Sequence, residues 1–339
     1  MFDALLILSF GGPEGPDDVM PFLRNVTRGR NVPDERLAVV AEQYALFGGV
    51  SPINDHNRAL IAALEAEFET HGVDLPIYWG NRNWHPYLAD TVAQMADDGV
   101  QHALVFATSA FSSYSGCRQY REDLERAAVP GGPTLDKLRL FYNHPGFLEP
   151  AAANVAEALA QFDPDRRPRL LFTAHSVPTA MAATSDYVSQ LEEAAAIVAD
   201  LAGYRGEWDL VFQSRSGPPQ VPWLEPDIGD HLRSLAADGV DEVVVCPLGF
   251  VSDHMEVLYD LDTLAASVAD EVGITMVRAA TVGNAPAFVS MIRALVEERR
   301  NEAPRLFLGA SGPWPDSCPE GHCAVPERPT GRPGGRPSS

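Results

Sequence analysis

Residues 5–13 read LLILSFGGP, and residues 170–178 read LLFTAHSVP. In both stretches a short apolar run ends in a turn of small residues and a proline, which is typical of a buried strand and its strand-end loop. Two more pairs of similar segments follow in the same order: 80–83 (GNRN) with 213–216 (QSRS), and 96–105 (ADDGVQHALV) with 236–245 (AADGVDEVVV). Three echoes in one order indicate a duplicated lobe.

Apolar runs of strand length alternate along the chain with amphipathic segments of helical length. The runs lie at 4–9, 75–79, 102–107, 169–173, 209–212 and 242–247. Helical patterns separate them, as at 57–70 and 189–202. This alternation predicts βαβ units with parallel sheets, and therefore an α/β fold.

The chain is too long for one ordinary core. Its 339 residues, at roughly 100–200 residues per domain, predict an N-terminal α/β lobe over 1–150 and a C-terminal α/β lobe over 151–311. Residues 312–339 are rich in Pro, Gly and Arg, which predicts a disordered tail.

Charge and composition exclude several classes of protein. The formal net charge is −22, which argues against nucleic acid and anionic lipid as partners and is compatible with metal cations. No stretch approaches the roughly 20 apolar residues of a membrane helix, and the N-terminus lacks a basic leader region. Four cysteines are too few for a disulfide scaffold of this size. We expect a cytoplasmic protein that is not integral to a membrane.

Ligands of open parallel sheets bind beyond the carboxyl ends of the strands, where the echoed turns lie. Phe10 and His175 hold equivalent places in the two copies, so we expect both to face a cleft shared by the lobes. There His175 would be a general base or a metal ligand; the alternative is a histidine that caps the next helix.

The segment 250–262 (FVSDHMEVLYDLD) follows an apolar run and is rich in acidic residues. Glu256 and Asp260 are four residues apart and share one face of a helix. A line of carboxylates at a cleft suits capture and relay of a divalent cation. The alternative is a solvated acidic face.

Polar donors occur in three other loops: Arg28 and Arg30 in NVTRGR, Ser51 in GGVSPI, and Tyr120 in FSSYSGCRQYR. Such donors could hold carboxylates; alternatively they form a basic loop, a tight turn and a helix cap. The SFGGP turn lacks the glycine spacing of nucleotide-binding loops.

Taken together, the motifs LSFGGP, RGR, FGGVSPIN, GNRNWHPYLAD, TAHSVP, QSRSGPPQVPWLEP and CPLGFVSDHMEVLYDLD resemble those of ferrochelatases in order and spacing. The resemblance runs from residue 3 to about 300 and is similar to the coproporphyrin-using bacterial branch. It implies two Rossmann-like lobes that grip a macrocycle between them.

The resemblance also implies roles for individual residues. His175 matches the family's active-site histidine and Glu256 its metal-site glutamate, with Asp260 as an acid relay. Ser51 and Tyr120 match porphyrin-contacting positions. Thr27 stands where some relatives have Arg, so we expect the propionate contacts to shift to Arg28 or Arg30. Phe10 matches the position beneath the macrocycle, where Phe cannot ligate iron.

The activity implied by the resemblance is insertion of Fe²⁺, as a substrate, into coproporphyrin III with release of two protons, in haem biosynthesis. No organic cofactor is implied, and we expect a monomer. Alternatives are a protoporphyrin IX ferrochelatase, a cobalt or nickel chelatase, and a haem or porphyrin carrier, which would not need Glu256.

Some ferrochelatases carry a [2Fe–2S] cluster, which usually needs four thiolates. Near its C-terminus this chain offers only Cys318 and Cys323, and the segment 145–155 contains no cysteine. We therefore expect no cluster.

Overall fold

The computed structural model describes residues 2–30, 32–217 and 219–325, and it contains two four-stranded parallel sheets. The first has the order β2-β1-β3-β4 and the second β6-β5-β7-β8. The strands are β1 (Ala4–Ser9), β2 (Ile77–Asn81), β3 (His102–Ala107), β4 (Thr134–Lys137), β5 (Arg169–His175), β6 (Trp208–Gln213), β7 (Glu242–Cys246) and β8 (Thr275–Arg278). The matching orders confirm the α/β class and the duplication, because each echoed segment occupies the same place in its sheet.

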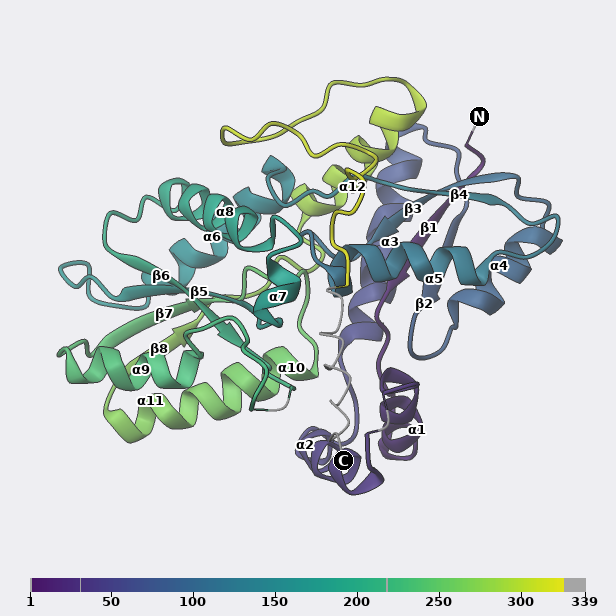
Figure 1. Ribbon diagram of the computed structural model, residues 1–339. Helices are drawn as coiled ribbons and strands as arrows, with labels where there is room; N and C mark the ends of the chain where they lie inside the picture. The colour runs from purple at the N-terminus through teal and green to yellow at the C-terminus, as the bar shows by residue number, and fades with distance from the viewer. Residues whose placement is uncertain (1, 31, 218, 326–339) are drawn as a thin grey trace, which may run out of the picture.

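The helices lie on both faces of each sheet (Figure 1). Those of the first half are α1 (Pro16–Val26), α2 (Asp34–Ala45), α3 (Ile53–His71), α4 (Leu88–Asp97), the π-helix η1 (Tyr114–Arg118) and α5 (Gln119–Ala127). Those of the second half are α6 (Pro145–Leu159), α7 (Thr179–Ala182), α8 (Tyr187–Leu201), α9 (Ile228–Ala237), α10 (Met255–Val257), the π-helix η2 (Leu258–Ala265), α11 (Ala266–Val272) and α12 (Pro286–Arg300). No helix among the described residues has the length and apolarity to cross a membrane.

Strand β1 is buried on both faces, which explains its unbroken apolar run. Successive side chains of a strand point to opposite faces. Leu6 and Leu8 pack with residues of α4 and α5, whereas Leu5 and Ile7 pack with residues of α3.

The two sheets share one central core. Leu170 and Phe172 of β5 belong to the same cluster of buried residues as Leu5 and Ile7 of β1, and the cluster also contains residues of α3, α6, α8 and α12. The far face of the second sheet is covered by α9, η2 and α11. Helix α12 packs on both α3 and α6, and the expected boundary at 150/151 falls inside α6.

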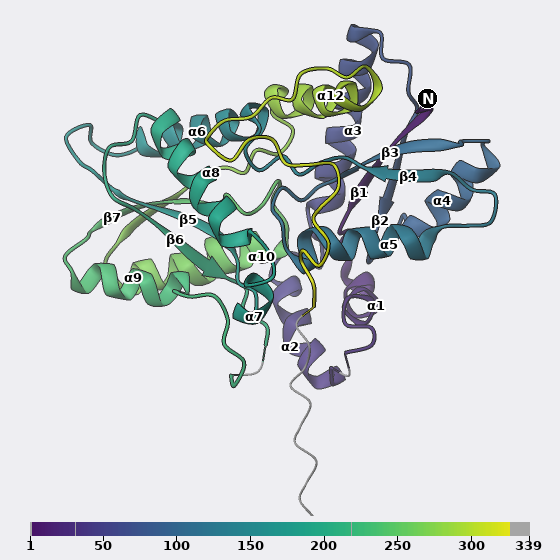
Figure 2. The same ribbon diagram turned by 45° about the horizontal axis from the view of Figure 1, so that its top comes forward.

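The C-terminal segment was expected to be disordered from residue 312, but residues 312–325 are hydrogen-bonded to the body of the protein. Asn143 Nδ2 donates to the Gly312 carbonyl at 2.7 Å, and Cys323 N donates to the Thr184 carbonyl at 2.7 Å. We name residues 302–325 the strap; it runs from α12 across the molecule toward α7 (Figure 2). Residues 326–339 of the expected tail lie outside the described residues.

Candidate active site

The carboxyl ends of β5 and β6 and the helix that follows β7 bring the two strongest sequence candidates together. His175 is the last residue of β5, and Glu256 lies in α10. His175 Nε2 is 3.5 Å from Glu256 Oε2, and the side chains are 33% and 53% exposed. Both groups are therefore held in place and open to a ligand.

The orientation of the His175 ring is fixed by its backbone. Nδ1 lies 2.5 Å from the Ser176 carbonyl oxygen; because a carbonyl only accepts, Nδ1 carries the hydrogen and donates. The Tyr187 hydroxyl donates to the His175 carbonyl at 3.0 Å. These bonds leave Nε2 facing Glu256, so the exposed nitrogen is the one that can exchange a proton.

The two groups shift each other's affinity for protons. Burial favours neutral His175, but the Glu256 carboxylate, its hydrogen bond and the Ser176 carbonyl outweigh burial and raise the pKa of His175. Burial would raise the pKa of Glu256, yet the charge of His175 and its hydrogen bond lower that pKa to about 2. The pair without substrate therefore favours the imidazolium form of His175 beside the Glu256 carboxylate.

Asp260 lies one helical turn beyond Glu256, in η2, and its carboxylate accepts a hydrogen bond from the Ser214 hydroxyl. Burial is the largest influence and raises its pKa; the Ser214 bond lowers it and the Glu256 charge raises it, giving about 6. Ser214 has a left-handed backbone, with φ of 62°, which is uncommon outside glycine and occurs at functional sites.

The acidic segment is divided between two tasks. Asp253 and Asp262 both pair with Arg278, at 3.1 and 2.6 Å, so they bind a cation of the protein itself. Glu256 and Asp260 pair with no arginine or lysine among the described residues and lie beside His175. Of the four carboxylates in the segment, Glu256 and Asp260 are therefore the two that lie beside His175 without an arginine partner among the described residues.

Four residues near the pair were not predicted from the sequence. His254 caps α10 by accepting from Glu256 N–H at 3.2 Å, and Gln213 Nε2 donates to the Glu256 carbonyl at 3.1 Å. Ser214 holds Asp260, and Tyr44 of α2 is close enough to Glu256 that, after burial, the carboxylate charge raises its pKa. The QSRS echo was the available sequence signal for the β6 end.

Phe10 and Ser51 lie in the first lobe, at the carboxyl end of β1. Phe10 is half-buried and packs edge-on against Phe22, with ring centroids 6.3 Å apart. Ser51 is buried, and its N–H donates to the Pro13 carbonyl at 2.8 Å. Phe10 is therefore part of the SFGGP turn, and Ser51 is hydrogen-bonded to that turn.

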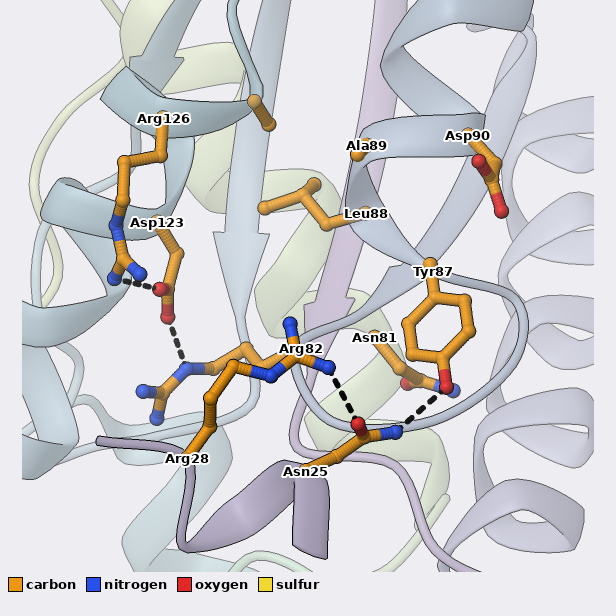
Figure 3. A pocket seen from close by; sticks show the side chains of 11 residues that line it. Asn25, Arg28, Asn81, Arg82, Tyr87, Leu88, Ala89, Asp90, Asp123 and Arg126 are labelled. Atoms are coloured by element: carbon orange, nitrogen blue, oxygen red, sulfur yellow. Dashed lines mark hydrogen bonds and ion pairs between the residues drawn. The ribbon is translucent and has the colours of Figure 1, made fainter. Parts of the chain in front are cut away.

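The remaining candidates do not gather around His175. Tyr120 is buried at 5% exposure, and the Arg82 guanidinium covers its ring at 4.5 Å. Arg28 and Arg30 are exposed after α1, and Arg28 lines a pocket of about 450 Å³ with Arg82 and Arg126. Figure 3 shows this pocket, which is built wholly from the first lobe.

Among the described residues, no group of three or more His, Cys, Asp or Glu side chains could hold a metal ion. His175 and Glu256 offer one nitrogen and one carboxylate. Cys318, followed by burial, raises the pKa of the Cys117 thiol, and Cys323 Sγ lies 3.0 Å from Nδ1 of His322. Whether these thiols hold a cluster stays a prediction.

Comparisons with known proteins agree with this geometry. The family model described as Ferrochelatase matches residues 2–300. The chain is 57% identical to the coproporphyrin III ferrochelatase of Frankia alni, covering 96% of this chain and 87% of that protein. It is 53% identical to the ferrochelatase of Rhodopirellula baltica, covering 99% and 97%.

Solved structures with the same fold are more distant in sequence. SirB from Bacillus subtilis, solved with Fe³⁺, matches with a TM-score of 0.54 at 12% identity, covering 89% of this chain and 98% of that one. A multi-domain protein from Deinococcus radiodurans with structural similarity to chelatases matches with a TM-score of 0.52 at 14% identity, covering 89% and 56%. These likenesses concern the fold alone.

Proposed function

The chain belongs to the ferrochelatase family, and from this premise we propose that it inserts Fe²⁺ into coproporphyrin III with release of two protons. The observation that carries the proposal is the exposed His175–Glu256 pair at the sheet edge, 3.5 Å apart. A free-base porphyrin loses two pyrrole protons as the metal enters, so the site must supply a base and a cation ligand. The pair provides both.

We propose that charge competition drives the proton steps. Before iron arrives, Glu256 favours the imidazolium form of His175. A ferrous ion that reaches the Glu256 carboxylate takes over the role of that positive charge, so His175 loses its proton. The neutral imidazole then accepts a pyrrole proton through Nε2, because Nδ1–H stays bound to the Ser176 carbonyl.

Asp260 is the proposed next proton acceptor. Its pKa of about 6 lies closer to neutral pH than that of an ordinary carboxyl, so Asp260 can both accept and release a proton. Each turnover must clear two protons, and Asp260 lies on the helix that begins at the metal-binding carboxylate. In this proposal Glu256 receives the metal ion and Asp260 removes the protons.

The macrocycle is proposed to lie between the lobes, with Phe10 on the face opposite His175 and with Ser51 and Tyr120 beside it. Phe has no lone pair for iron, so the product would lack an axial ligand from that residue. Arg28 and Arg30 are the proposed propionate contacts. Tyr120 would need Arg82 to move, because the guanidinium covers its ring.

Protoporphyrin IX is the second candidate substrate, because the Rhodopirellula relative carries the unspecified name ferrochelatase. Anaerobic incubation with Fe²⁺ and each porphyrin, followed through the absorption bands, separates the two. We expect a higher kcat/KM with coproporphyrin III; a higher value with protoporphyrin IX would reverse the assignment, and porphyrin binding without metal insertion would indicate a carrier.

His175→Ala should abolish insertion while porphyrin still binds, and Glu256→Gln should lower the rate at least about 100-fold, on the scale typical of a lost acid–base group. Asp262→Asn is the matched control, since it removes an acid of the same segment that is bound to Arg278. Equal effects of Glu256→Gln and Asp262→Asn on the rate would contradict the proposed site.

We also propose that the protein acts as a monomer in the cytoplasm. The four cysteines are free, as is usual in a reducing compartment. Light scattering of the purified protein tests the monomer directly.

A further inference from the structure

The pocket of about 450 Å³ in the first lobe lies apart from the His175–Glu256 pair. Its walls come from the end of α1, the end of β2, the start of α4, and α5. None of its lining residues belongs to the second lobe. It is therefore a separate cavity, and Arg28 is the one lining residue to which the proposed function gives a role.

The pocket is locally positive in a strongly negative protein. Its walls hold three guanidinium groups and two carboxylates, +3 − 2 = +1, while the whole chain carries −22. Asp123 accepts from both Arg82 and Arg126, so one carboxylate serves two cations. Among the described residues, Arg28 Nη2 donates to the neutral Asn25 Oδ1 alone, at 2.6 Å.

The remaining carboxylate does not neutralise this excess. Asp90 has no ion pair among the described residues, and Figure 3 shows it turned away from the arginines. The cavity therefore holds three guanidinium groups against one paired carboxylate, that of Asp123.

Backbone donors and one hydroxyl face the same space. Helix α4 has ten residues, and its N-cap, Tyr87, makes no side-chain cap bond. Leu88, Ala89 and Asp90, which line the pocket, are the first helical residues, so their N–H groups lack intrahelical acceptors. The Tyr87 oxygen accepts from Asn25 Nδ2 at 2.8 Å, which leaves its O–H free to donate.

We propose that this pocket binds a small dianion with oxygen acceptors, of the phosphate or dicarboxylate class. Uncompensated guanidinium charge and the uncapped start of a helix are the two donor types that recognise such anions. The Arg82 guanidinium lies 5.9 Å from the Phe10 ring centroid and 4.5 Å from that of Tyr120. An occupant would thus contact the residue that supports two proposed porphyrin contacts.

The test uses thermal melting and calorimetry of the full chain with inorganic phosphate and with succinate, at constant ionic strength. We expect saturable binding in the millimolar range and a melting temperature that rises with ligand, because a ligand specific to the folded state stabilises it. Arg126→Gln should weaken binding at least fivefold. Arg24→Gln, on α1 but outside the pocket and paired with Asp34, should leave it unchanged.

Ala89→Asp keeps the experiment decisive if an arginine variant folds poorly. Ala89 is exposed in the first turn of α4, where an acid is favourable to the helix but repels an anion. This variant should melt no lower than the parent protein and should lose the response to phosphate. Binding that survives both Ala89→Asp and Arg126→Gln, or no saturable binding of either anion, would overturn the proposal.

A competition experiment with coproporphyrin III distinguishes the two possible sources of the anion, a propionate of the porphyrin or a free anion. If a propionate of the porphyrin enters the pocket, phosphate will raise the apparent Kd of the porphyrin, and Ala89→Asp will weaken porphyrin binding. If the ligand is a free anion, phosphate and porphyrin will bind together. The anion site stands or falls independently of iron insertion, because its readout needs no turnover.

Discussion

Gln213 shows how one buried side chain can set the geometry of the candidate site. It is 1% exposed and lies beside His175 in the register of β5 and β6. Its carbonyl accepts from Ser176 N–H at 2.8 Å, and its Nε2 donates to the Glu256 carbonyl at 3.1 Å. Gln213 therefore connects the strand that carries the base to the helix that carries the carboxylate.

Gln213→Met should lower the rate constant for metal insertion about tenfold, because it removes the donor and keeps the volume, and misplacement of a reacting group by about 1 Å costs up to about 100-fold. NMR titration should show the His175 pKa moving down toward its ordinary value as Glu256 shifts away. Gln190→Met is the matched control, since Gln190 is likewise buried, at 2% exposure, and accepts a hydrogen bond from Ser112 N–H. An effect on melting alone, with an unchanged rate and His175 pKa, would contradict the positioning role.

The Asp260 carboxyl gives the site a pH dependence whose sign can be worked out. Its pKa is raised from 3.8 to about 6, so between these values the folded protein retains a proton that the unfolded chain has released. Stability therefore falls as pH rises through this window. Asp260→Asn should raise the melting temperature well above pH 6, leave it nearly unchanged below pH 4, and slow metal insertion.

The Ser214 hydroxyl opposes this shift, because its hydrogen bond lowers the Asp260 pKa. Ser214→Ala should move the acidic limb of the kcat/KM profile to higher pH, while Asp260→Asn should remove that limb. The measurement is the rate of iron insertion across the pH range under anaerobic conditions. A limb that stays at the same pH in Ser214→Ala would assign it to another group.

At the scale of elements, the strap joins segments that are far apart in sequence. Trp314 packs edge-on against Tyr142, with ring centroids 6.4 Å apart, and Gly312 bonds Asn143. Farther along, Cys323 bonds Thr184 near the end of α7. Apolar cover and backbone hydrogen bonds together explain why a segment rich in proline and glycine is ordered here.

Deletion of residues 312–339 should therefore destabilise the protein by roughly 3 kcal/mol, from one partly buried tryptophan and a few hydrogen bonds. Metal insertion by the folded fraction should persist, because no residue of the proposed site lies in the strap. Deletion of residues 326–339 alone serves as the control. Chemical denaturation measures the stability of both variants, and rate measurements follow their metal insertion. Equal stabilities of the two deletion variants would contradict this prediction.

The elements that were predicted correctly are those with local signals. β1 and β3 were predicted with the observed bounds, because strands buried on both faces need continuous apolar runs. β4 (TLDK) and β8 (TMVR) were missed. Each is a four-residue strand at a sheet edge with mostly half-exposed side chains, so no apolar run marks it.

The contrast between local and long-range signals also explains which residues near the candidate site could be predicted. Glu256 and Asp260 were found through their spacing on one helix, and His175 through the duplicated turn. Gln213, Ser214 and Tyr44 depend on how β6 and α2 come to lie beside α10, and no local spacing encodes that. Residues 312–325 of the strap were expected to be disordered because their composition is typical of disorder, while their hydrogen bonds are made with residues far away in the sequence.

At the scale of the whole molecule, a buried ion pair joins helix α12 to the first lobe. Arg139, which follows β4, pairs with Glu298 of α12 at 2.7 Å, and the side chains are 1% and 2% exposed. Arg139 Nη2 also donates to the Leu306 carbonyl at 2.9 Å. Since α12 packs on α3 and α6, this contact adds to the core that both lobes share.

Glu298→Gln should destabilise the protein by about 3–5 kcal/mol, because it leaves a buried guanidinium without its counter-charge. The double variant Arg139→Met with Glu298→Leu should recover much of this loss, since apolar side chains of similar volume often replace a buried pair without cost. Asp34→Asn, in the exposed Arg24 pair, should cost far less than Glu298→Gln, because water screens an exposed pair. Urea denaturation of the parent protein and the three variants measures the free energy of unfolding of each. If the double variant were no more stable than Glu298→Gln, the loss would come from packing and from the Leu306 carbonyl rather than from uncompensated charge.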